Sequence, residues 1–204
     1  MVSLAAVLLA VPMALAAPSA AFASGQPIDP TTLNPPLEHG SPVCVWRGTQ
    51  IVCHSTVPQY HDLGTLDSGI NCSGAELFQT VHWTLVRGIA IYNAQRNIVK
   101  LIYVDAYTGS FSNPANGRSV AWTQEDVTEY VFTTPGDNST GTATMKVIQR
   151  VYGSTGRVIL TDVGTEVFSI PDYTRLKATG HHPIDDYFYG GSTTGIAPLC
   201  NALT

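Results

Sequence analysis

The chain has 204 residues, of which 10 are Lys or Arg and 15 are Asp or Glu, so its formal charge is −5. Charged residues make up 12% of the chain, against about 25% in an average globular protein. This length fits a single domain that can bury a core without a structural metal. The basic residues are few and scattered, which argues against nucleic acid as a partner.

The N-terminal segment predicts export. Residues 4–15 are almost entirely apolar, and an Ala-x-Ala site ends at Ala23, so we expect residues 1–23 to be a cleaved signal peptide. The residues before the apolar run include no Lys or Arg, which departs from the usual pattern. Pro12 and Pro18 interrupt the segment and argue against an uncleaved membrane anchor. The sequence therefore predicts a secreted, extracellular protein with no stable membrane insertion after cleavage.

The four cysteines also favour an oxidising compartment, because an even number is usually paired there. A two-residue turn at Gly48-Thr49 would place Cys44 directly opposite Cys53 in a hairpin, which predicts a disulfide between them. A disulfide between Cys72 and Cys200 then follows by elimination. Zinc is rejected because the cysteines are 9, 19 and 128 residues apart, without the close pairs of a zinc site.

Two regions follow the signal peptide. Residues 24–42 contain five prolines and no apolar periodicity, so we expect a flexible segment there. Residues 43–204 form the single predicted domain. Its expected strands beyond the hairpin are 76–92, 98–111, 119–132, 142–152, 157–170 and 173–179, each with alternating apolar residues between turn signals. Residues 197–203 are expected to form a short helix that Cys200 anchors.

Long consecutive strands joined by short turns indicate an antiparallel meander. Gly88 inside the first long strand suggests a bulge or bend, as a curved sheet needs. With the hairpin added, we predict an all-β fold of about eight strands that closes into a small, lipocalin-like barrel. A two-layer β-sandwich is the alternative.

The sequence offers few candidates for chemistry and lacks the common motifs for hydrolases, phosphate, dinucleotides, zinc and calcium. His181, His182 and Asp185 lie close together and could in principle bind a divalent ion. Adjacent side chains of an extended segment point in opposite directions, so an exposed polar turn is the favoured interpretation. We therefore predict neither a metal site nor a cofactor.

Isolated polar residues within the strands are weaker candidates. His82 could act as a general base if it faces a barrel interior, although a single histidine in a strand more often has a structural role. Acidic residues on two of the strands are interpreted as solubilising groups on a solvated face. They are Asp105, Glu125, Asp126 and Glu129.

Several short segments resemble uncharacterised secreted all-β proteins of actinomycete-type bacteria. The matching pieces cover most of residues 75–203 and are Val86-Arg87-Gly88 with Ile91-Tyr92, residues 108–114 followed by Gly117, Val163-Gly164 with Val167-Phe168, Gly180-His181-His182, and residues 199–203. The resemblance implies secretion and an all-β fold. That family has no assigned activity, so it implies no functional residue.

These observations favour a non-enzymatic secreted β-barrel that binds a small apolar or amphipathic molecule. The aromatic residues that would line its interior are Trp83, Tyr103, Trp122 and Tyr130, although they could equally fill a solid core. One alternative is a small secreted enzyme of the isomerase or cyclase type that uses His82 or the His181, His182 and Asp185 group. Another is a cell-surface interaction protein with residues 24–42 as a spacer.

Overall fold

A computed structural model describes residues 25–37, 42–55 and 58–204, so the predicted signal peptide lies outside the described residues. The described chain consists mainly of strands, with a 3₁₀ turn at Pro30–Thr32 and two short helices, α1 (Pro183–Gly190) and α2 (Ala197–Leu203). The strands are β1 (Pro27–Ile28), β2 (Val43–Arg47), β3 (Gln50–His54), β4 (Gln59–Cys72), β5 (Ala75–Tyr92), β6 (Ile98–Asn113), β7 (Arg118–Val131), β8 (Gly141–Tyr152), β9 (Val158–Ile170) and β10 (Arg175–His181).

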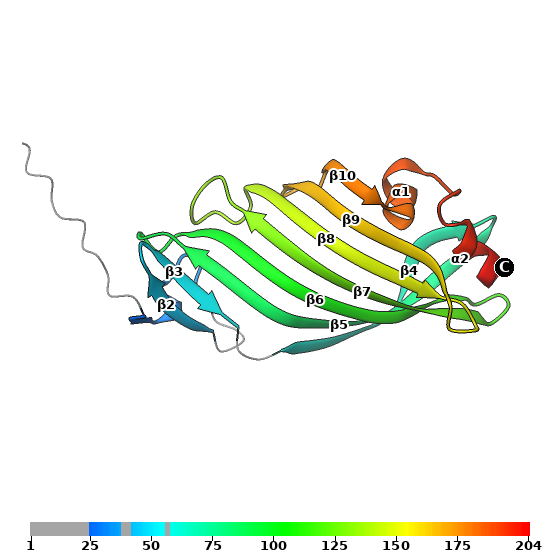
Figure 1. The fold of residues 1–204 in the computed structure, drawn as a ribbon, viewed down its shortest axis with the longest axis horizontal. Helices are drawn as coiled ribbons and strands as arrows, with labels where there is room; N and C mark the ends of the chain where they lie inside the picture. Colours follow the sequence, from blue (N-terminus) through cyan, green and yellow to red (C-terminus); the bar gives the residue numbers. More distant parts are fainter. Residues whose placement is uncertain (1–24, 38–41, 56–57) are drawn as a thin grey trace, which may run out of the picture.

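All ten strands belong to one antiparallel sheet (Figure 1). The strands from β5 to β10 follow one another as a meander. Both β3 and β4 pair with the same edge of β5, where β3 contacts residues 89–92 and β4 contacts residues 75–85. The sheet is strongly curled, because side chains from the six strands β4 to β9 line a single cavity.

The predicted closed barrel is wrong, because the described strands form an open sheet in which β10 pairs only with β9. After the seven residues of β10 the chain forms α1 instead of another strand. Both helices are tied to β4. The Asn71 backbone N–H donates to the Tyr187 hydroxyl of α1 at 2.9 Å, and the Cys72–Cys200 disulfide joins β4 to α2. Helices therefore cover the opening that a strand ladder would otherwise close.

The hairpin and both disulfides are confirmed. Gly48 adopts a positive φ of +63° in the turn, and β2 and β3 pair with Cys44 directly opposite Cys53. The Cα atoms of Cys44 and Cys53 are 4.0 Å apart, and those of Cys72 and Cys200 are 5.3 Å apart. The second disulfide closes a sequence separation of 128 residues and anchors the predicted C-terminal helix.

The six strands predicted from alternation are all present, with ends that differ by up to two residues, but two strands were missed. Strand β4 contains Gly, Asp and Ser among few apolar residues, so its sequence lacks a strand signal. Strand β1 lies in the proline-rich segment, which is ordered along residues 25–37 through pairing with β2. Leu33 of this segment is buried against the hairpin and adds to the core there.

Two apolar clusters make up the core. One lies beneath the helices and includes Leu77, Phe111 and Leu199. The other lies beneath the hairpin at the opposite end of the long strands and includes Trp46, Ile51 and Tyr92. The concave face of the sheet between these clusters carries polar side chains, and it holds the candidate site.

Candidate functional site

A cavity of about 510 Å³ lies on the concave face of the sheet, partly covered by α1. Because side chains alternate along a strand, every second residue of β7 from Trp122 to Tyr130 points into it. The lining includes three carboxylates, and in the part of the chain that the structure describes it contains no Lys, Arg or His. Its polar and aromatic side chains are Ser68, Gln79, Asp105, Tyr107, Trp122, Gln124, Asp126, Thr128, Tyr130, Gln149, Tyr173, Asp185, Phe188 and Tyr189, with Phe111 and Phe168 at its margins.

Asp105 and Asp126 form the floor of this cavity as direct neighbours across β6 and β7. They are 7% and 5% exposed. The Trp83 indole Nε1–H donates to Asp105 Oδ1 at 2.9 Å, and the Gln124 amide donates to Asp126 Oδ2 at 3.0 Å. Neither carboxylate forms an ion pair with a basic residue of the described chain. Two adjacent carboxylates are therefore largely buried on the cavity floor, with no basic residue of the described chain paired to either.

This environment raises the pKa of both carboxyl groups. Burial raises the pKa of Asp105, which the bond from Trp83 partly offsets. Burial raises the pKa of Asp126 to about 6, and the charge of Asp105 adds to this increase. Asp126 therefore exchanges its proton near neutral pH, and its charged form favours any cation that reaches the cavity.

Aromatic rings surround the two carboxylates. Tyr107 stacks on Trp83 with ring centroids 6.5 Å apart, and Tyr130 meets Tyr103 edge to face at 5.9 Å. Burial raises the pKa of the Tyr107 hydroxyl, and the charges of Asp126 and Asp105 raise it further. The hydroxyl therefore stays protonated and can donate a hydrogen bond at any physiological pH.

Trp122 has a different role at the end of the cavity. Its indole lies over Gly109 of β6, where a Cβ atom would come within 2.9 Å of the ring. The side chain is 4% exposed, and its Nε1–H has no hydrogen-bond partner within the described chain. Buried donors usually have a partner, so this N–H is suited to an acceptor on a bound molecule.

The four predicted lining residues divide between two cavities. Trp122 and Tyr130 line the concave cavity, while Trp83 and Tyr103 line a neighbouring one of about 420 Å³ near the hairpin. Trp83 links the two because its indole bonds to Asp105. The solid-core alternative describes only the end of the concave cavity where Trp122 packs on Phe111, with ring centroids 5.9 Å apart.

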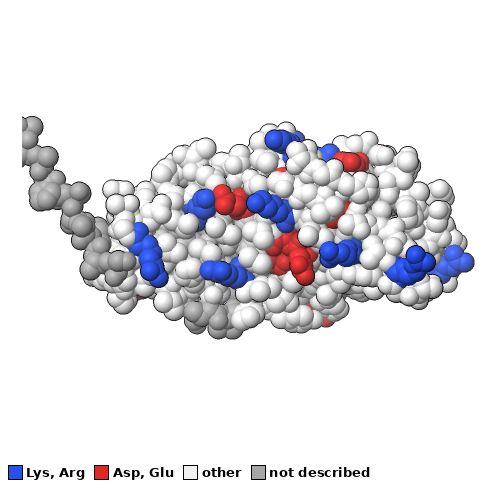
Figure 2. All heavy atoms as spheres, viewed as in Figure 1, with Lys and Arg blue, Asp and Glu red and all other residues white. Residues whose placement is uncertain are grey.

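The acidic residues also divide by face. The interpretation as solubilising groups holds for Glu125, which is exposed, and for Glu129, which pairs with Lys100 at 2.9 Å. It is wrong for Asp105 and Asp126, which are buried on the concave face. On the face shown in Figure 2, basic and acidic side chains are intermingled, whereas the charged side chains among the described residues of the cavity lining are all acidic.

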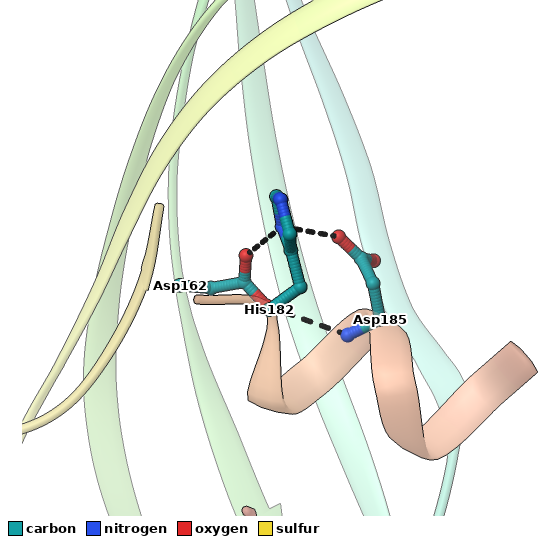
Figure 3. Close-up of side chains that lie close together, drawn as sticks. All are labelled: Asp162, His182 and Asp185. Atoms are coloured by element: carbon teal, nitrogen blue, oxygen red, sulfur yellow. Dashed lines mark hydrogen bonds and ion pairs between the residues drawn. The ribbon is translucent and has the colours of Figure 1, made fainter. Parts of the chain in front are cut away.

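A second polar cluster joins β9 to the start of α1. The His182 Nδ1 atom lies 2.9 Å from Asp162 Oδ1 and 3.6 Å from Asp185 Oδ2 (Figure 3). Asp162 Oδ2 accepts the backbone N–H of Ile184 at 3.0 Å, and His182 Nε2 lies 3.1 Å from the carbonyl oxygen of Thr179. His182 is 4% exposed and Asp162 is 1% exposed, so this is an internal cluster and not an exposed turn.

The cluster carries strongly perturbed groups. Burial lowers the pKa of His182, but its bonds to Thr179 and Asp162 outweigh this effect and raise it overall. Burial raises the pKa of Asp162 against the opposing hydrogen bonds from His182 and Ile184. The pKa of Asp185 is raised to about 7 by burial, with further contributions from the charges of Asp162 and Glu166.

The structure separates the other histidine candidates from both sites. His82 lies on the outer face of β5, where its Nδ1 is 3.1 Å from the Tyr60 hydroxyl and 3.4 Å from Asp62. His181 ends β10 and is exposed, so only His182 of the adjacent pair points inward. The sequence missed Asp162 and Glu166 because they lie about twenty residues before the histidines, on a strand whose register was unknown.

Comparisons with known proteins find no matching family model, no significantly similar curated protein and no significantly similar solved structure. No described helix is long and apolar enough to cross a membrane. The resemblance to secreted actinomycete-type proteins stays a prediction.

Proposed function

We propose that this chain is a secreted protein that binds a small amphipathic molecule in the concave cavity, with a positively charged head group on the Asp105 and Asp126 carboxylates. The observation that carries this proposal is a cavity of about 510 Å³ whose lining, among the residues that the structure describes, has three carboxylates and no basic side chain. Such a lining attracts cations and repels anions.

The carboxylate pair supports a cationic head group. Like charges placed directly opposite on neighbouring strands are destabilising, and Asp105 and Asp126 occupy such positions. Asp105 accepts from Trp83, and Asp126 accepts from Gln124 and interacts with Thr128, which leaves further lone pairs on both carboxylates for a ligand. A cationic head group between them would supply the missing counter-charge, and a head group with N–H bonds would also supply donors.

The aromatic lining supports the same class of ligand. An organic cation is attracted to the faces of aromatic rings by about 0.5–2 kcal/mol, depending on desolvation. Tyr107 and Tyr130 lie on the same strands as the carboxylates and line the same cavity. The apolar part of the ligand would extend toward the Trp122 ring. The indole N–H, which has no partner in the described chain, could donate to a ligand that also carries an acceptor atom at that end.

Secretion is supported by the two disulfides, because paired cysteines persist in oxidising compartments. The predicted signal peptide agrees with this destination. Intact-mass analysis of the protein from its host tests it. We expect a chain that starts at Ser24 with both disulfides formed, whereas an intracellular protein that retains residues 1–23 would refute secretion.

The ligand class is tested with three probes that share an eight-carbon tail, namely octyltrimethylammonium, octanol and octanoate. We expect saturable binding of the ammonium probe by calorimetry and at least about tenfold weaker binding of octanoate, which corresponds to about 1.4 kcal/mol. Equal binding of all three would show a purely apolar cavity. Absence of binding by all three would overturn the proposal.

A pair of variants locates the binding. Asp126→Asn removes the charge on the concave face, and Glu125→Gln removes one charge from the next residue, on the outer face. We expect Asp126→Asn to lower the affinity for the ammonium probe at least about tenfold and Glu125→Gln to leave that affinity nearly unchanged. Equal effects of the two variants would mean that the probe responds to net charge and not to the cavity.

A further inference from the structure

We propose that Asp162, His182 and Asp185 form a binding site for one divalent transition-metal ion between β9 and α1, with the buried Glu166 carboxylate beside it. Asp185 also lines the concave cavity, whereas Asp162, His182 and Glu166 lie outside its lining. The inference rests on these residues and not on Asp105 and Asp126, so it does not depend on the proposed ligand. It differs from the expectation from the sequence, in which the histidine turn was an exposed loop without a metal.

The donor atoms already converge. One ligand atom each from Asp162, His182 and Asp185 lies within 4.8 Å of the other two. Carboxylate oxygens and imidazole nitrogens bind such ions at about 2.0–2.2 Å, so ligands of one ion lie roughly 3–4 Å from each other. The distances of 2.9 Å and 3.6 Å from His182 Nδ1 fall close to that range. In Figure 3 the three side chains point toward one another.

The surrounding bonds orient the ligands. Each imidazole nitrogen lies beside an acceptor, Nε2 at 3.1 Å from the Thr179 carbonyl and Nδ1 at 2.9 Å from Asp162 Oδ1. A metal ion on Nδ1 would therefore displace the proton from that nitrogen, while the bond to Thr179 keeps the other proton on Nε2. The Ile184 N–H holds Asp162 Oδ2, which directs Oδ1 toward His182. Gly164 leaves room for the ring, because a Cβ atom there would overlap His182 Nε2.

Glu166 supplies an independent sign of a missing partner. It is 0% exposed, and its Oε1 accepts from Arg175 at 2.9 Å. Its Oε2 is buried without a hydrogen-bond partner in the described chain, and its carboxylate interacts with that of Asp185. A hydrogen bond to Glu166 helps to raise the pKa of Asp185, so the two carboxyl groups share a proton when no cation is bound. A metal ion on Asp185 would replace that proton and place a positive charge beside Glu166.

The side chains around the cluster carry more negative than positive charge, which favours a bound cation. Asp162, Glu166 and Asp185 are three largely buried carboxylates, and Arg175 is the nearby permanent positive charge, already shared with Asp186 at 3.2 Å. A divalent ion would balance the remaining charge. Imidazole favours Zn²⁺ and other transition metals, whereas carboxylates also suit Mn²⁺, so this mixed set points to Zn²⁺ or Mn²⁺ in preference to Ca²⁺ or Mg²⁺.

The test uses the whole mature chain after treatment with a chelator. ZnCl₂ and MnCl₂ are titrated by calorimetry, and native mass spectrometry gives the number of ions per chain. We expect one ion per chain for at least one of the two metals. In protein labelled with ¹⁵N-histidine, we expect the His182 Nδ1 resonance to shift on saturation with Zn²⁺ while Nε2 keeps its proton.

Three variants distinguish the internal site from adventitious surface binding. Asp185→Asn and Glu166→Gln keep the size of each side chain, and we expect each to lower the affinity for the metal ion at least about tenfold. His181→Gln changes the exposed neighbouring histidine, and we expect it to bind as the original protein does. Near-UV circular dichroism identifies variants that fail to fold, and the NMR measurement requires no variant.

Three results would overturn the proposal. They are the absence of saturable binding of both ions, loss of binding in His181→Gln, and a His182 Nδ1 that stays protonated and unshifted at saturating Zn²⁺. The last result would mean that the cluster is an internal ion pair between a protonated His182 and Asp162. Failure of the ammonium probe to bind in the cavity would leave this inference unaffected.

Discussion

Replacement of Asp126 by Asn should stabilise the protein at neutral pH and not in acid. The carboxyl pKa is about 6 in the folded chain against an ordinary value of 3.8, so the folded state holds the proton more tightly than the unfolded state. Stability contributed by this group is therefore fully present below about pH 4 and is lost as the pH rises through about 6.

The magnitude follows from the size of the pKa change. A shift from 3.8 to about 6 corresponds to roughly 3 kcal/mol of lost stability above pH 7, at 1.36 kcal/mol per unit. An amide keeps the shape and can still accept from Gln124, without the charge beside Asp105. We expect Asp126→Asn to increase the free energy of unfolding by about 1–3 kcal/mol near pH 7.5 and to change it little near pH 4.

Urea unfolding followed by tryptophan fluorescence measures this difference at the two pH values. Glu125→Gln is the matched control because it removes one charge from the exposed face at the next residue. An increase in stability limited to Asp126→Asn near pH 7.5 supports the argument. A loss of stability of equal size at both pH values would refute it, because the carboxylate would then act through its hydrogen bonds and not through its buried charge.

Two further predictions concern the cavity and the disulfides. Thr128→Trp should fill the concave cavity and abolish binding of octyltrimethylammonium in calorimetry. Val127→Trp, on the outer face, should leave that binding intact. Unchanged binding by Thr128→Trp would mean that the ligand binds elsewhere. Replacement of the Cys72–Cys200 disulfide by serines should lower the free energy of urea unfolding by roughly 5 kcal/mol, against roughly 2.5 kcal/mol for Cys44–Cys53, because the first closes the longer loop. An equal or reversed order would contradict the loop-length argument.

Local patterns predicted most of the sheet. Alternation identified the strands from β5 to β10, and the two-residue turn at Gly48-Thr49 set the register that pairs Cys44 with Cys53. Closure was wrong because it depends on the ends of the sheet. The polar strand β4 and helix α1 lie at those ends, and neither segment has a strong sequence signal for its secondary structure.

The candidate sites were harder to predict because they depend on register between strands. Asp105 and Asp126 are 21 positions apart, and only the pairing of β6 with β7 places them side by side on the concave face. The sequence identified His182 as a candidate. Its partner Asp162 lies on β9, and it comes close to His182 only because β9 pairs with β10. The strand pattern placed Asp105 and Asp126 on a solvated face, which is the usual location of charged residues, and it did not identify Asp162 as a candidate.

The central claim is that the concave cavity holds a cationic amphiphile, and native mass spectrometry of the protein secreted by its own host tests it most directly. We expect a reproducible mass excess that disappears on denaturation, belongs to a molecule with an ammonium group, and is absent from Asp126→Asn but present in Glu125→Gln. A retained molecule that is neutral or anionic, or a chain without any excess that also fails to bind octyltrimethylammonium, would contradict the claim.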